Sequence, residues 1–282
     1  MRNRTNACCV SVQVVVAVLS ASALCKSAAC EELPPESFSQ AEAYQKLLRT
    51  HQVKGTSTDR LSGEQEFVRY EQVGDQVVRS ETLDGLTDVS VRNHAYYFRV
   101  IRPVEGGKWN VVYVNQQKDE SGSYTRPCHA GTRLGFAMET VWGALQKNHL
   151  DVVSITATSD DPNSDVTVKM VCSEQAPADF RVDSGTFVFS REHYWLIKEA
   201  RLSETLPNGG SGVVRIEHEI SICEPLDLPV ISKKKVNGVY MQADPSGPEV
   251  ILNYEIDYAF DKLIDDDPNR FKLTRFGLPE PD

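Results

Sequence analysis

The second half of the chain consists almost entirely of strand-like runs with turn-rich separators between them. β-branched and aromatic side chains dominate these runs, and such side chains suit a pleated, half-buried surface. In one run apolar Val214 and Ile216 alternate with charged Arg215 and Glu217, which indicates a strand with one dry and one wet face. Parallel strands need crossover helices, and no helical pattern separates these runs. We therefore predict antiparallel sheet. The runs lie at 152–157, 166–172, 186–189, 194–202, 213–223 and 250–258.

The first half adds shorter strand runs and two helical patterns. Runs at 66–70 and 76–82 flank one hairpin turn, runs at 89–91 and 95–101 flank a second, and 109–114 is also β-rich. Ser39 with Glu42 forms a capping box, which predicts the start of an N-terminal helix. Apolar residues at helical spacing predict a central helix over 132–147. The expected fold class is α+β, mainly antiparallel β, with a curved sheet and these two helices.

The N-terminus has the order of a secretory signal peptide: a basic start, an apolar run and then small residues. The apolar run is shorter than the roughly 20 residues of a membrane-spanning helix, and no later stretch could span a bilayer. We predict a signal peptide over 1–29, a linker over 30–37 and a single β-rich domain over 38–282. Cleavage after Ala23 and after Ala29 both fit, and a retained membrane anchor is the alternative. The expected location is the periplasm or cell envelope.

Cys30 is a candidate for lipidation. The sequence Ser27-Ala28-Ala29-Cys30 resembles a bacterial lipobox, although Ser27 stands where that motif usually has Leu or Val. Lipidation would make Cys30 the first residue of a lipid-anchored mature protein.

The chain is acidic, with a formal net charge of −10. The leader contributes only basic residues, so the rest of the chain is more acidic still. A surface of this sign repels phosphates, which argues against nucleic acid as a partner and against binding to anionic lipid head groups through charge. The short basic run Lys233–Lys235 is predicted to guard an exposed edge strand.

The cysteines beyond the leader and its boundary are Cys128, Cys172 and Cys223. Export permits a disulfide, and three cysteines allow three pairings. We favour Cys172 with Cys223, because each follows a strand-like run, while buried free thiols are the alternative. The chain contains no Cys-x-x-Cys motif, which excludes zinc-ribbon and thioredoxin-type sites.

No catalytic or cofactor motif stands out. The chain lacks a nucleophile elbow, a phosphate-binding loop and a dinucleotide fingerprint. No histidine has another at metal-binding spacing, so we predict neither a metal nor a cofactor. Cys128 and His129 are the one adjacent pair of soft ligands, and a Cys-His catalytic site could be assembled around them.

One feature favours ligand binding. The predicted central helix presents Leu134, Met138 and Trp142 on its apolar side. Lying across a curved sheet, these side chains could line an apolar cleft, and an ordinary core helix is the alternative. The sheet residues expected opposite them are Tyr96, Phe98, Trp109 and Tyr113.

The order of leader, helix, strand meander, helix and further strands resembles the periplasmic lipoprotein carriers and sensors of the LolA, LolB and RseB group. The resemblance covers most of residues 38–260 and implies an incomplete antiparallel barrel whose hollow takes acyl chains. No family motif matches residue by residue, so no functional residue is carried over. The tail 270–281, ending Phe-Gly-Leu-Pro-Glu-Pro, resembles uncharacterised secreted planctomycete proteins and implies export. We expect Phe271, Leu273 and Phe276 to form a last strand.

The leading hypothesis is an exported, non-enzymatic binding protein that holds a lipid or a lipidated partner in a curved-sheet cleft. The first alternative is a structural or protein-interaction module of the cell envelope. The second is a hydrolase that uses dispersed carboxylates or Cys128 with His129. The sequence determines neither the ligand nor the oligomeric state.

Overall fold

A computed structural model describes residues 31–50, 53–61, 64–74, 76–83, 85–115, 140–206, 208–244, 247–263 and 267–281. The predicted signal peptide, Cys30, Cys128, His129, Leu134 and Met138 lie outside the described residues. No helix within the described ranges is long and apolar enough to cross a bilayer.

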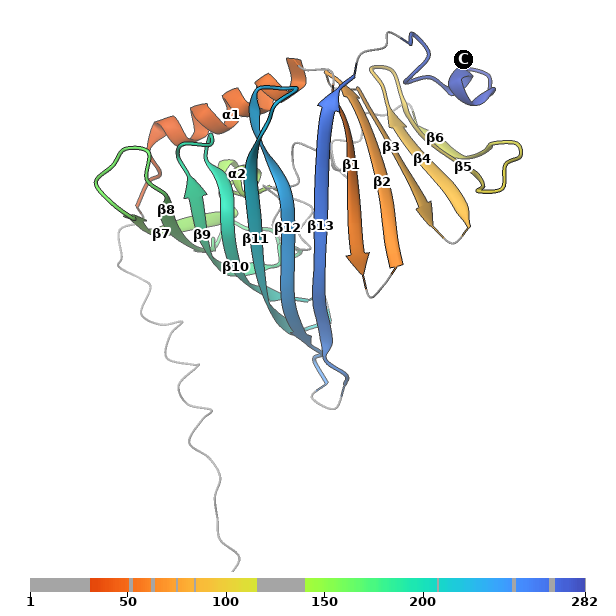
Figure 1. Cartoon of the computed structure of the whole chain (residues 1–282). Helices are drawn as coiled ribbons and strands as arrows, with labels where there is room; N and C mark the ends of the chain where they lie inside the picture. Colours follow the sequence, from red (N-terminus) through yellow and green to blue (C-terminus); the bar gives the residue numbers. More distant parts are fainter. Residues whose placement is uncertain are drawn as a thin grey trace, which may run out of the picture.

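The described strands form one sheet of 13 strands in the order β6-β5-β4-β3-β2-β1-β13-β12-β11-β10-β9-β8-β7 (Figure 1). Neighbouring strands pair antiparallel throughout, and the order has two free ends, so the sheet is open. The predicted α+β, mainly antiparallel class is confirmed. The strands are β1 Val53–Leu61, β2 Glu64–Val73, β3 Gln76–Leu83, β4 Leu86–Arg92, β5 Tyr97–Pro103, β6 Asn110–Asn115, β7 Leu150–Ala157, β8 Val166–Cys172, β9 Val182–Ser190, β10 Leu196–Thr205, β11 Ser211–Cys223, β12 Leu228–Met241 and β13 Val250–Lys262.

The two faces of the sheet are covered at opposite ends. Residues paired directly across two neighbouring strands point to the same face of the sheet. Following these pairs from strand to strand shows that Leu202, Val214, Leu252 and, on β4, Asp88 share one face. We call this the inner face. Helices α1 (Pro35–Thr50) and α2 (Val141–Gln146) pack on it, over the strands β7 to β12 (Figure 1). The C-terminal tail packs instead on the outer face of β3 to β5, against Val89 and Phe98.

Helix α1 begins earlier than its sequence pattern predicts. Its first residue is Pro35, which suits a first helical position because the missing N–H has no helical partner there. Ser39 lies inside the helix, where its hydroxyl donates to the carbonyl oxygen of Glu36. Residues 35–37 of the linker expected over 30–37 therefore belong to α1.

Glu31, within the predicted linker, is attached to the sheet. Its backbone N–H donates to the carbonyl oxygen of Val152 at 3.2 Å, and its carboxylate accepts from the N–H of Ile155 at 2.7 Å. The segment before α1 therefore covers part of the exposed edge of β7.

Helix α2 is much shorter than the predicted helix over 132–147. Thr140 has extended backbone angles of −85° and 156°, and its hydroxyl accepts from the N–H of Gly143 as an N-cap. The helix therefore starts at Val141, and Thr140 separates it from residues 132–139, which lie outside the described residues.

Two further expectations are corrected by the sheet order. Lys233–Lys235 lie on β12, an interior strand, where Lys233 pairs with Glu255 at 2.9 Å rather than guarding an edge. Cys172 and Cys223 are free thiols. They lie on β8 and β11, which β9 and β10 separate. Strand spacings of about 4.8 Å place such strands about 14 Å apart, beyond the limit of about 7 Å for a disulfide.

The tail packs as expected but is not a strand. Phe271 and Leu273 are buried, and residues Leu273–Phe276 form a 3₁₀ turn, η2, that ends at Gly277 with φ of 69°. Arg270 is buried beside the carboxylate of Glu71, at 3.1 Å from Nε, and Arg275 contacts the same carboxylate. These ion pairs fasten the tail to β2.

Candidate functional site

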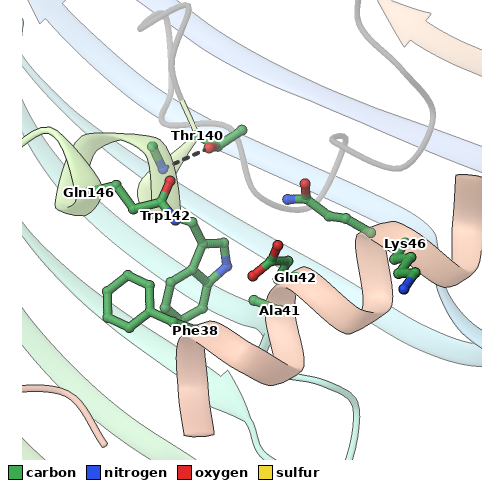
Figure 2. A pocket seen from close by; sticks show the side chains of 9 residues that line it. Phe38, Ala41, Glu42, Lys46, Thr140, Trp142 and Gln146 are labelled. Carbon is green, nitrogen blue, oxygen red and sulfur yellow. Dashed lines mark hydrogen bonds between the residues drawn. The ribbon is translucent and has the colours of Figure 1, made fainter. Parts of the chain in front are cut away.

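The candidate site is a cleft of about 490 Å³ between α1 and the start of α2. Both helices pack on the inner face of the sheet, and Figure 2 shows their side chains converging from opposite sides. The volume falls within the range of about 300–1,000 Å³ that is typical of small-molecule sites. The cleft is lined by Phe38, Ala41, Glu42, Gln45, Lys46, Thr140, Trp142, Gly143 and Gln146.

The apolar part of the lining is aromatic. The ring of Phe38 meets the indole of Trp142 edge-on, at 5.3 Å between centroids. On the sheet side, Trp142 packs against Phe189 at 5.3 Å and Trp195 at 6.4 Å, both of which are buried. The contacts of Trp142 with Phe38 and Trp195 are edge-to-face, a geometry that is favourable beyond the area it buries. Trp142 is therefore held rigidly, and the space between it and the sheet is filled.

The polar part of the lining has no partners. Glu42, Gln45 and Lys46 follow one face of α1, and Gln146 lies across the cleft on α2. Within the described part of the chain, these four side chains make no hydrogen bond or ion pair. A carboxylate and an ammonium group one helical turn apart, with two amides, can therefore contact a ligand without breaking existing bonds.

The indole N–H of Trp142 is a further donor. Figure 2 shows this nitrogen on the side of the ring that faces Glu42. Among the residues that the structure describes, it has no hydrogen-bond partner, and it is not one of the fully buried unpaired atoms. A buried tryptophan usually has a partner for this group, so a ligand acceptor would complete the site.

The sequence located one member of this site, Trp142, but placed it against the wrong neighbours. Trp142 belongs to the cluster over β7 to β12, whereas Tyr96, Phe98 and Trp109 belong to the cluster under the C-terminal tail. Tyr113 packs on Tyr97 at 5.6 Å. The predicted cleft between the central helix and these four aromatic residues is therefore wrong.

The α1 side of the cleft was not predicted from the sequence. Phe38, Ala41, Glu42, Gln45 and Lys46 recur at spacings of three and four residues and so share one helix face. This helical spacing is visible in the sequence. The helix face that it defines mixes apolar and charged side chains, however, and does not by itself indicate a binding face. Only the approach of α2 turns it into the wall of a cleft.

No group of three or more His, Cys, Asp or Glu residues is arranged to hold a metal ion within the described ranges. Because Cys128 and His129 lie outside those ranges, the structure does not test a Cys-His catalytic site.

The sequence matches no family model. It also matches no curated protein. A solved structure of a DUF1329 family protein from Desulfovibrio piger has a similar backbone path. Its TM-score is 0.46 and its sequence identity is 8%, and the match covers 85% of this chain and 97% of that chain.

Proposed function

We propose that this chain is an exported, non-enzymatic binding protein whose ligand lies in the cleft between α1 and α2. One observation carries the proposal: a rigid aromatic wall faces polar side chains that have no partners within the described part of the chain. Apolar pockets with a few convergent polar groups are the usual form of a small-molecule site. The leader pattern supports export, and the lipobox-like sequence before Cys30 supports anchoring at the envelope.

The lining indicates an amphipathic ligand with one apolar chain or ring. Its apolar part would lie on Phe38 and Trp142, where the wall is aromatic. A polar head carrying both charges would meet Lys46 and Glu42. The filled space between Trp142 and the sheet favours a molecule lying in the open cleft over acyl chains enclosed by the sheet.

Lysophosphatidylcholine, with one chain and a zwitterionic head, is a suitable probe. Isothermal titration calorimetry would measure its affinity for the wild-type protein and for a double variant, Glu42→Gln with Lys46→Gln. Hydrogen bonds to charged groups contribute about 1.5–3 kcal/mol each, so we expect affinity to fall at least about tenfold. Both side chains are exposed, so the variant should fold normally.

A matched control neutralises one acid and one base away from the cleft, Glu36→Gln with Lys169→Gln, both exposed. The control should bind like the wild type. Failure of the wild type to bind lysophosphatidylcholine and monoacylglycerol would refute an amphiphile site, and equal weakening of both double variants would place binding elsewhere.

A further inference from the structure

The outer face of the sheet carries an exposed apolar patch at one end of β11, β12 and β13. Val213, Val239 and Ile251 are paired directly across these three strands, and Met241 follows two residues further along β12. Their exposed fractions are 48%, 43%, 70% and 55%, in that order. Single exposed apolar side chains are ordinary on a protein surface, whereas a contiguous group of them marks a contact surface. We call these four residues the outer patch.

The next rows of the outer face on the same strands are polar. The row beside the outer patch consists of Arg215, Asn237 and Asn253. In the row beyond it, Lys235 forms an ion pair with Glu255 at 3.6 Å. Each residue adds about 3.3 Å along a strand, so this charged row begins about 13 Å from the nearest row of the outer patch. The outer face therefore changes along these strands from apolar, through a row with two amides, to charged.

The charges around the outer patch indicate which kind of surface it fits. Residues 237–254, which run from the end of β12 through the turn into β13, include Asp244 and Glu249 and no Lys or Arg. An anionic membrane repels such acids, whereas a zwitterionic bilayer has no net charge to oppose them. The outer patch is also small for a protein partner, because a stable interface uses about 20–30 residues on each side. Binding to a lipid surface instead scales with whatever apolar area is buried.

We propose that the outer patch is a membrane contact, through which this chain rests on zwitterionic lipid. Apolar faces that bind at a membrane interface are buried about 5–10 Å deep. Immersion to that depth covers the outer patch and leaves the ion-paired rows in water. The cleft between α1 and α2 lies on the opposite face of the sheet and stays accessible. A single acyl chain binds membranes only marginally, so the outer patch would also supply the second contact that the predicted lipid on Cys30 requires.

Cosedimentation with phosphatidylcholine vesicles tests this proposal. The protein is residues 31–282, so that no lipid anchor contributes, at about millimolar lipid, which detects binding as weak as that of one acyl chain. We expect the wild type to bind and Ile251→Asn with Met241→Gln to lower the partition coefficient about tenfold or more. Both side chains are largely exposed, so the double variant should fold normally.

The matched control is Ile222→Asn with Val104→Gln. These two residues are exposed by 56% and 51% and lie outside the outer patch, so the control should bind vesicles like the wild type. Quenching by brominated phosphatidylcholine then locates the contact. A tryptophan introduced as Ile251→Trp should be quenched beyond the wild-type signal, whereas Ile222→Trp should add no quenching.

Several outcomes overturn the proposal. These are a wild type that does not bind at millimolar lipid, equal loss of binding in the patch and control variants, and binding that requires anionic lipid. A stable dimer that Ile251→Asn dissociates, without vesicle binding, would make the outer patch an interface between copies instead. Glu42→Gln with Lys46→Gln should bind vesicles like the wild type. Loss of vesicle binding in that variant would assign the membrane contact to the cleft, which overturns this inference and leaves the proposed function standing.

Discussion

Acidification should destabilise this protein through one histidine with a buried ring nitrogen, His218 on β11. Its Nδ1 donates to the carbonyl oxygen of Ile197 at 2.8 Å, so the neutral ring carries its proton there. Its Nε2 is buried without a hydrogen-bond partner, and Lys234 lies directly opposite on β12. Burial, reinforced by the charge of Lys234, lowers the pKa of His218 to about 3. The hydrogen bond to the backbone of Ile197 acts in the opposite direction but is the smaller effect.

The sign and size of this pH effect on the unfolding free energy follow from the difference in proton binding between the unfolded and folded states. In the unfolded chain a histidine has a pKa of about 6.5, so below that value the unfolded state binds a proton that the folded state does not. The stabilisation is therefore fully present above about pH 6.5 and is lost as the pH falls toward 3. Each pH unit in this window removes about 1.4 kcal/mol, so lowering the pH from 7 to 5 removes about 2 kcal/mol.

Urea unfolding at a series of pH values measures this effect. His218→Gln keeps a donor near Ile197 and removes the titrating group. The difference in unfolding free energy between wild type and His218→Gln should shrink by about 2 kcal/mol from pH 7 to pH 5. His94→Gln, a change at an exposed histidine, is the control for the substitution itself. A difference that stays constant with pH, or an NMR titration showing a protonated His218 at pH 5, would refute the reasoning.

Two further predictions concern stability. Gly212 lies between Glu204 and Tyr240, whose hydroxyl donates across it to the carboxylate, and a Cβ on Gly212 would come within 2.2 Å of the tyrosine ring. Gly212→Ala should therefore lower the unfolding free energy by about 1–3 kcal/mol, whereas an unchanged denaturation midpoint would contradict the packing. Glu71→Ala leaves buried Arg270 without this partner and should cost about 3 kcal/mol or free the tail. Limited proteolysis would then cut the tail in the variant first, and equal cleavage of wild type and variant would argue against the fastening role.

Local patterns predicted most of the strands correctly. The hairpin between 66–70 and 76–82 is present as β2 and β3, joined through Gly74 with φ of 60°. The alternation of Val214 and Ile216 with Arg215 and Glu217 on β11 also holds, because period two depends only on which face of one strand is buried. A property contained within a few neighbouring residues can be read from them.

Boundaries and special positions were less predictable. The capping box at Ser39 is a valid start signal, yet α1 starts at Pro35, where the preceding Glu31 is already held by β7. Tail residues Phe271 and Leu273 were expected to form a strand, but they form a turn because a buried ion pair and an apolar surface receive them. In both cases, contacts with distant elements outweigh local preference.

From its own residues, the sequence determined an acidic composition and a mainly antiparallel β fold, and it predicts an exported-type leader. Tertiary structure decided which strands are edges and which residues meet. Among the described strands, it placed β12 in the interior of the sheet and β6 at one end. It also made Phe38 the neighbour of Trp142 across about a hundred residues of chain. The physical reason is that strand order and helix docking minimise the exposed apolar area of the whole chain. That area depends on contacts between distant segments, so it cannot be calculated from a short stretch of sequence.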